Sequence, residues 1–151
     1  MTNAANALVI YNRKILLLLR DNIPKLTDPN CWSLIGGQVE PGEDFDTALK
    51  RELMEEINVV PKNLQKLGRL VLPDGSKRMF YLARLTAEEV KQIKLGNEGQ
   101  RLEFFSSKEM EKLALGKYSA RYYAAYKDYL HQIIDSNGKI KIEPKKLGLT
   151  K

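Results

Sequence analysis

The sequence predicts an α+β or α/β fold in which helices pack on both faces of a mixed β-sheet. Short apolar runs and helical segments follow one another in the order β-β-β-α-β-β-β-α-α. The 151 residues, 43% of them hydrophobic and 29% charged, suit one domain with a real core. No repeat or linker divides the chain, so we expect a single domain over residues 1–135 and a basic C-terminal tail over 136–151.

Two apolar runs near the N-terminus predict a β-hairpin. They cover residues 7–11 and 14–20, and the second is apolar enough to be buried on both faces. Residues 21–30 hold two prolines and many polar side chains, which predicts a loop. A brief strand over 31–35 then leads into a pair of glycines.

A helix is predicted over residues 44–57. Leu49, Leu53 and Ile57 recur every four residues and form a stripe that faces the core. Asn58 follows the stripe, and asparagine tolerates the left-handed conformation that ends many helices. The charged side chains of this helix must therefore lie beside the stripe, outside the core.

The second half of the chain predicts another hairpin, one more strand and two helices, and a further short helix within the polar segment 86–100 stays open. A Pro-Asp-Gly-Ser turn joins the two strands of the hairpin. Hydrophobic period and capping residues place the remaining elements. The predicted ranges are strands at 64–72, 78–85 and 101–105, helices at 107–115 and 118–134, and the open short helix at 87–93.

Composition and charge exclude several classes of protein. The single cysteine rules out an internal disulfide framework. No apolar run approaches the roughly 18 residues of a membrane span, and the N-terminus lacks the features of a signal peptide. We therefore expect a cytoplasmic protein without a membrane partner.

Much of the net charge of +6 lies in the tail, which carries five lysines and one glutamate. We expect this tail to be solvated and partly disordered. No aromatic residue interrupts its lysines, so nucleic acid is not an expected partner.

The most informative segment is a glycine loop followed by an acidic helix, residues 37–59. Glu52, Glu55 and Glu56 fall within one helical turn, where like charges repel one another. A divalent cation would turn this repulsion into binding, and oxygen ligands suit Mg²⁺ or Mn²⁺ far better than zinc. Arg51, four residues before Glu55, is placed to hold a carboxylate in position.

This segment resembles the Nudix box. That pattern is Gly, five residues, Glu, seven residues, then Arg-Glu-hydrophobic-any-Glu-Glu-any-Gly-hydrophobic. The residues that fit are Gly37, Glu43, Arg51, Glu52, Leu53, Glu55, Glu56 and Val59. Asn58 stands where the family has glycine, and asparagine can adopt the same backbone conformation. Residues 96–106 are also similar to a segment of the antimutator protein MutT, so the chain is identified as a MutT-like member of the Nudix superfamily.

The resemblance implies an α/β/α sandwich with a mixed central sheet and a Mg²⁺ site, for which Mn²⁺ is a substitute. It implies that Glu52, Glu55 and Glu56 bind the metal. Glu43 would contribute directly or through water, and the carbonyl of Gly37 would add a neutral oxygen.

The resemblance also implies a catalytic set made of the three box glutamates, Arg51 and Glu98. In several Nudix enzymes a glutamate on the corresponding late loop acts as general base or as an extra metal ligand. Glu98 occupies that place here, between Gly96 and Gly99. One of the box glutamates remains the other candidate base.

Substrate-binding residues are less clear from the sequence. Arg20, at the end of the second strand, is either a partner for a phosphate or a solvated cation. Arg78 and Tyr81 on the second hairpin are candidates for contact with a base or a sugar. We expect Trp32 in the core, and the tyrosines of the last helix in packing roles.

Members of this family hydrolyse a nucleoside diphosphate linked to another group, so a small-molecule nucleotide is the expected partner. We favour a nucleoside triphosphate pyrophosphohydrolase that releases a monophosphate and pyrophosphate, because the chain has no large N-terminal extension of the kind that many ADP-ribose enzymes use to dimerise. The alternatives are an ADP-ribose or nucleotide-sugar pyrophosphatase and a nucleotide-binding regulatory module without turnover. The complete set of charged box residues counts against the module, and monomer and homodimer both stay open.

Overall fold

A seven-stranded mixed β-sheet forms the centre of the molecule in the computed structural model, which describes residues 2–151. Its strands are β1 (Ala4–Tyr11), β2 (Lys14–Leu19), β3 (Trp32–Ser33), β4 (Ile35–Gln38), β5 (Asn63–Val71), β6 (Lys77–Arg84) and β7 (Arg101–Phe105). The order is β3-β2-β1-β6-β5, while β4 pairs with β1 and β7 pairs with β2. Only β1 and β6 run parallel, so the predicted mixed sheet is confirmed.

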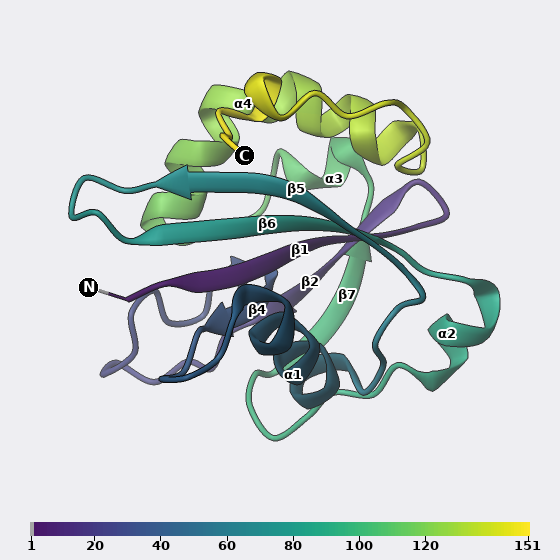
Figure 1. Ribbon diagram of the computed structural model, residues 1–151. Helices are drawn as coiled ribbons and strands as arrows, with labels where there is room; N and C mark the ends of the chain where they lie inside the picture. The colour runs from purple at the N-terminus through teal and green to yellow at the C-terminus, as the bar shows by residue number, and fades with distance from the viewer. Residues whose placement is uncertain (1) are drawn as a thin grey trace.

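Helices cover both faces of this sheet, as predicted (Figure 1). They are α1 (Phe45–Ile57), α2 (Ala87–Gln92), α3 (Ser107–Met110), α4 (Lys117–Asp135) and a 3₁₀ helix, η1 (Pro144–Leu147). The α3 and α4 helices lie on one face, while α1 lies on the other face with α2 at its side (Figure 1).

The alternation of side chains along β1 divides the core into two halves. Leu8 and Ile10 belong to the cluster under α4, whereas Ala7 and Val9 belong to the cluster under α1. The β2 strand also buries both of its faces, as its apolar run predicts. The sheet therefore separates two compartments that can carry different chemistry.

The α1 helix begins and ends where the sequence predicts. The Asp44 side chain accepts the backbone N–H of Thr47 at 2.7 Å and caps the first turn. Asn58 adopts the left-handed conformation at φ 64° and ends the helix. All three side chains of the predicted apolar stripe are fully buried, which fixes the rotation of α1 and directs its acidic flank toward β4.

Two predicted boundaries are wrong because the backbone changes its partners. The single strand expected over 31–35 is two strands, since β3 pairs with β2 while β4 pairs with β1. The helix expected to reach residue 115 ends at Met110. Its expected last turn is drawn toward the sheet, where Ala114 accepts a hydrogen bond from the backbone N–H of Trp32 at 2.9 Å.

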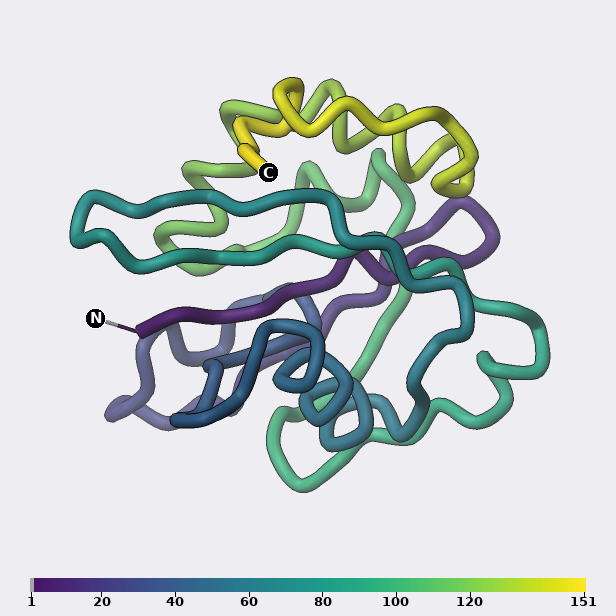
Figure 2. The backbone as a smooth tube through the Cα atoms, viewed as in Figure 1, coloured from purple at the N-terminus to yellow at the C-terminus, as the bar shows by residue number. Residues whose placement is uncertain are grey.

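The prediction of a solvated, disordered tail is wrong. Residues 136–151 run back along α4 and reach β5 (Figure 2). Leu147 and Leu149 are 0% and 2% exposed, and Arg69 and Thr150 exchange two backbone hydrogen bonds of 2.7 and 2.9 Å. The charge of the tail suggested solvation, but its apolar residues alternate with the exposed lysines and anchor the backbone.

We expect Leu147→Ala to lower the free energy of unfolding by about 2–5 kcal/mol, because it removes a fully buried side chain and leaves a cavity. Lys145→Ala, two residues away and exposed, should change it by less than about 0.5 kcal/mol. Urea unfolding of both variants measures the difference. Equal, small effects would show that the tail contributes nothing to the fold.

Candidate active site

Glu56 is a half-buried carboxylate at the end of α1, and it faces β4. Its Oε1 atom accepts the backbone N–H of Gly36 at 2.7 Å. Desolvation raises the pKa of Glu56 to about 8, and the charges of Glu52, Glu98 and Glu55 add to the shift, while the Gly36 N–H opposes it. The carboxylate therefore lies where a cation, or a proton, is needed to balance it.

Two glycines allow α1 and the sheet to approach each other this closely. Gly36 has a φ of +136°, and a Cβ there would lie 2.1 Å from the backbone oxygen of Ala5. At Gly37 a Cβ would lie 2.6 Å from the carboxyl carbon of Glu52. Gly37 thus leaves the space that Glu52 occupies above β4, and Gly36 allows β4 to lie close to β1.

Arg51 holds the carboxylates of the box together, as predicted. Its Nε atom donates to Glu43 at 2.8 Å, and its Nη1 atom lies 3.0 Å from Glu52 and 3.4 Å from Glu55. Its Nη2 atom also donates to the backbone oxygen of Gln38 at 2.9 Å. These contacts raise the pKa of Arg51 above its ordinary value, so the guanidinium acts as a permanent counter-charge.

Glu43 accepts three hydrogen bonds in this network. One oxygen accepts from Arg51 Nε, and the other accepts from Arg51 Nη2 at 3.0 Å and from the backbone N–H of Glu40 at 2.8 Å. The hydrogen bonds of Arg51 and Glu40 hold the pKa of Glu43 below its ordinary value. Glu43 therefore acts on the other carboxylates through Arg51, and its contribution as a metal ligand stays a prediction.

The loop that carries Glu98 lies against the end of α1. A Cβ on Gly96 would lie 1.8 Å from the carbonyl oxygen of Glu55, so only glycine allows this contact. The charge of Glu98 contributes to the raised pKa values of both Glu52 and Glu56. The fold thus brings Glu98 beside the box glutamates, although it lies 42 residues after Glu56 along the chain.

The donor set of this cluster fits a hard divalent cation. Within residues 2–151, no three acidic, histidine or cysteine side chains converge closely enough in this arrangement to hold a metal ion together. Arg51 pairs with Glu52 and Glu55 at 3.0 and 3.4 Å, so a cation would share these carboxylates with the guanidinium. The half-buried Glu56 and the carboxylates beside it offer oxygen ligands alone, which are the ligands that Mg²⁺ and Mn²⁺ prefer.

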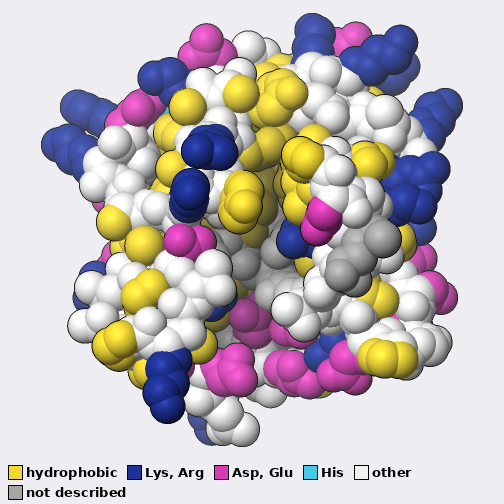
Figure 3. All heavy atoms as spheres, turned by 90° about the vertical axis from the view of Figure 1, so that its left-hand side faces the viewer, with side chains coloured by type: hydrophobic (Ala, Val, Ile, Leu, Met, Phe, Trp, Pro, Cys, Tyr) yellow, Lys and Arg dark blue, Asp and Glu magenta, His cyan; other side chains and the backbone are white. Residues whose placement is uncertain are grey.

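An apolar pocket of about 320 Å³ opens between the sheet and α4. The sheet contributes Leu8, Leu17 and Phe80, and α4 contributes Tyr118 and Tyr122. Figure 3 shows a hollow with hydrophobic side chains along its upper wall and acidic side chains along its lower edge. The pocket volume lies at the lower end of the range for small-molecule sites, which is about 300–1,000 Å³.

Asn6 connects the pocket to the acidic cluster. Its side chain lines the pocket, on the α4 side of β1. Asn6 also pairs with Gly36 across β1 and β4, and a Cβ on Gly36 would lie 2.9 Å from Asn6 Nδ2. Because Gly36 bonds Glu56, the pocket and the carboxylates lie on either side of one short strand.

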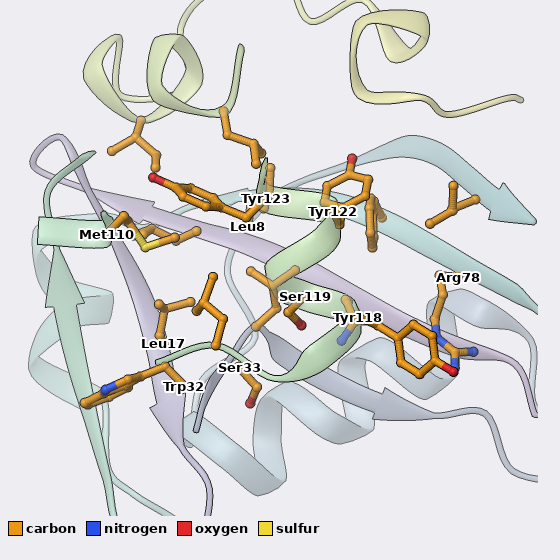
Figure 4. Close-up of a pocket in the computed structure, with 18 of the residues that line it drawn as sticks. Leu8, Leu17, Trp32, Ser33, Arg78, Met110, Tyr118, Ser119, Tyr122 and Tyr123 are labelled. Carbon is orange, nitrogen blue, oxygen red and sulfur yellow. The ribbon is translucent and has the colours of Figure 1, made fainter. Parts of the chain in front are cut away.

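Arg78 lines this pocket, and its contact with a base or a sugar stays a prediction. It lies with Tyr118 at one end, opposite Trp32 and Met110 (Figure 4). One of its Nη atoms donates to the backbone oxygen of Thr2 at 2.6 Å, which holds the side chain in place.

Tyr81 does not join Arg78, because the two residues point to opposite faces of β6. Tyr81 is buried under α1, where its hydroxyl donates to Asp46. Burial and the neighbouring Asp46 raise the pKa of Tyr81, so it stays a neutral donor. Arg78 and Tyr81 therefore lie on opposite faces of β6, and contact of Tyr81 with a base or a sugar stays a prediction.

Arg20 lies outside the apolar pocket. Its Nε atom donates to the backbone oxygen of Thr27 at 3.1 Å and closes the loop that follows β2. Contact of Arg20 with a phosphate stays a prediction.

Sequence reasoning missed the roles of Asn6 and of the start of α4. Trp32 is 7% exposed, as expected for the core, but it also forms a wall of the pocket. Tyr122 lines the pocket as well, although its helical spacing indicated packing alone. No local signal marks Asn6, because its importance comes from its pairing with Gly36.

A NUDIX domain model matches residues 1–126. The chain therefore belongs to the Nudix family. None of its helices over residues 2–151 combines the length and apolar character that a membrane crossing requires.

Three relatives of this chain carry the names of different activities. The ADP-ribose pyrophosphatase of Methanocaldococcus jannaschii is 33% identical over 113 residues, which cover 74% of this chain and 65% of that protein. The nucleoside triphosphatase NudI of Escherichia coli is 32% identical over 83 residues, covering 48% and 59%. The RNA pyrophosphohydrolase of Rhodopseudomonas palustris is 29% identical, covering 68% and 65%. The matches span less than two thirds of the length of each relative.

Solved structures confirm the fold. A MutT structure from a study of the Aliivibrio salmonicida and Vibrio cholerae proteins gives a TM-score of 0.66 at 19% identity, covering 89% of this chain and 97% of that one. The MutT protein of Methanosarcina mazei gives 0.65 at 20% identity, covering 92% and 96%. The predicted Nudix sandwich is therefore confirmed as a fold.

We expect alanine at Gly37 to weaken metal binding and alanine at Gly36 to destabilise the fold. Gly37→Ala meets only the flexible end of Glu52, so the fold should survive while divalent-ion binding weakens about tenfold. Gly36→Ala meets backbone at a positive φ and should cost more than about 2 kcal/mol of stability. Titration calorimetry with Mn²⁺ and urea unfolding measure the two effects. Normal Mn²⁺ binding by a folded Gly37→Ala variant would remove Glu52 from the site.

We expect the metal-free protein to lose stability as the pH rises from about 4.5 to about 8, because folded Glu56 keeps a proton that the unfolded chain releases. Glu56→Gln should flatten this slope and stabilise the protein at pH 8.5 by on the order of 2 kcal/mol. Adding Mg²⁺ should raise the melting temperature of the wild type and not of the variant. Glu88→Gln, on the exposed side of α2, is the control. An unchanged pH slope in Glu56→Gln would show that Glu56 is already ionised when folded.

Proposed function

We propose that the chain is a Mg²⁺-dependent pyrophosphohydrolase that cleaves the pyrophosphate linkage of a nucleoside di- or triphosphate derivative, with a nucleoside triphosphate as the favoured substrate. Water attacks a phosphorus atom, and the products are a nucleoside monophosphate and pyrophosphate. The observation that carries this proposal is the position of the pocket, which ends at Asn6, beside the strand that Glu56 contacts.

Glu52, Glu55 and Glu56 are the proposed metal ligands, with Gly37 and Glu43 in supporting roles. When bound, the metal neutralises the pyrophosphate and lowers the pKa of a coordinated water. Arg51 keeps Glu52 and Glu55 oriented through its 3.0 and 3.4 Å contacts.

Glu98 or one of the box glutamates removes the proton of the attacking water. Glu98 is exposed on its loop, while its charge reaches both Glu52 and Glu56. It is therefore free to approach a substrate without leaving the cluster.

The pocket holds the nucleoside end of the substrate in this proposal. Phe80 and Tyr122 contribute aromatic faces that suit a base, and their rings are 5.2 Å apart in an edge-to-face arrangement. Arg78 supplies a cation at the rim that can meet a phosphate or a sugar oxygen. The pocket offers one compartment of about 320 Å³, which favours a substrate with a single base.

An ADP-ribose or nucleotide-sugar pyrophosphatase is the second candidate. The 33% identity to a protein named ADP-ribose pyrophosphatase supports it. The same catalytic cluster would serve either substrate, so the choice depends on what the pocket and its rim accept.

The test is release of phosphate or pyrophosphate with Mg²⁺ over a panel of nucleoside triphosphates, ADP-ribose, nucleotide sugars and RNA with a 5′-triphosphate. We expect turnover of a nucleoside triphosphate, and a loss of kcat by a factor of about 10²–10⁴ in Glu56→Gln. Glu88→Gln should keep the wild-type rate. Binding of Mg²⁺ and nucleotide without turnover of any compound would instead indicate a regulatory module.

A further inference from the structure

The segment after β2 forms a compact loop, residues 20–31, which we call the bridging loop. The backbone N–H of Arg20 donates to the oxygen of Cys31 at 2.9 Å, and that of Asn30 donates to Asp21 at 3.1 Å. Together with the contact from Arg20 Nε to Thr27 O, these bonds close the loop on itself. The bridging loop is therefore ordered by its own hydrogen bonds.

One end of the bridging loop is tied to the segment that carries Glu98. The carboxylate of Asp21 accepts the backbone N–H of Gly99, the next residue after Glu98, at 3.1 Å. The side-chain amide of Gln100 donates to Arg20 O and to Asn30 Oδ1, both at 2.8 Å. Three hydrogen bonds thus hold the Glu98 segment from the side opposite α1.

The other end of the bridging loop is tied to the first turn of α4. This helix has Gly116 at its N-cap, which offers no side chain to the free N–H groups of the first turn. Asp28 Oδ1 accepts the N–H of Lys117 at 3.2 Å in its place. A Cβ on Gly116 would lie 2.5 Å from Asp28 Oδ2, so glycine is what admits this carboxylate.

The residues that follow this cap line the pocket. Tyr118 and Ser119 belong to the first turn of α4, and both contribute to the pocket wall. Asp28 also places a negative charge at the positive end of a 19-residue helix, which stabilises the helix start.

We propose that the bridging loop positions two separate parts of the active site. This proposal rests on the function proposed above. Asp21 is a positioning residue for Glu98 and serves the chemical step. Asp28 is a positioning residue for the start of α4 and serves substrate binding. One loop thereby sets the distance between the base pocket and Glu98, a candidate for the residue that removes the proton of the attacking water.

The experiment compares Asp21→Ala and Asp28→Ala in the full chain, with the best nucleotide found in the panel. We expect Asp28→Ala to raise KM about tenfold with kcat within about twofold of wild type. Asp21→Ala should lower kcat about tenfold and leave KM within about twofold. Asp21→Asn and Asp28→Asn keep an acceptor oxygen, so each should restore most of the loss. Asp128→Ala, an exposed carboxylate on the far part of α4, is the matched control and should keep wild-type kinetics.

Amide hydrogen exchange supplies a readout that does not need catalysis. Exchange at Gly99 should become at least about tenfold faster in Asp21→Ala, and exchange at Lys117 should do so in Asp28→Ala. Faster exchange at the named amide together with the split between kcat and KM supports the proposal. Equal losses of kcat in both variants with unchanged KM would overturn it, because that pattern indicates only less folded enzyme. Unchanged exchange at both amides would also overturn it, even if the wild type hydrolysed no compound in the panel.

Discussion

The molecule depends on keeping several carboxylates close together at one end of α1. Negative side chains repel one another there, and the structure offsets this repulsion with the guanidinium of Arg51 and with the N–H of Gly36, while burial of Glu56 adds to the cost of its charge. Each of these requires another part of the fold to be in place. The glycine pair must lie in β4, β4 must pair with β1, and the apolar stripe of α1 must be buried.

The central sheet turns this cluster into a site by separating two kinds of environment. The α1 face carries charge and oxygen donors, whereas the α4 face carries an apolar pocket. They meet only where the sheet is narrow, at the short β4 strand and Asn6. A nucleotide has the same division into a flat, poorly charged base and a polyanionic chain, which is why this arrangement suits it.

The α4 helix, which forms one wall of the pocket, is stabilised by contacts from two other segments of the chain. The tail buries Leu147 against α4, and the hydroxyl of Tyr122 donates to the backbone oxygen of Leu147 at 2.7 Å. At its other end, α4 takes its cap from Asp28 in the bridging loop. The pocket wall is therefore built from contacts between segments that are far apart along the chain.

The sequence by itself determined the local features of this protein. The stripe and caps of α1 and the spacing of Arg51 and its glutamates follow from residues a few positions apart, and the structure has them. The order of strands and helices also follows the sequence, except that the strand expected over 31–35 is divided into β3 and β4. Only the tertiary structure decided that Glu56 bonds Gly36, that the tail packs, and that Asp28 caps α4. These contacts depend on strand pairing and on which sheet face a residue occupies, and long-range pairing leaves no periodic trace in the sequence.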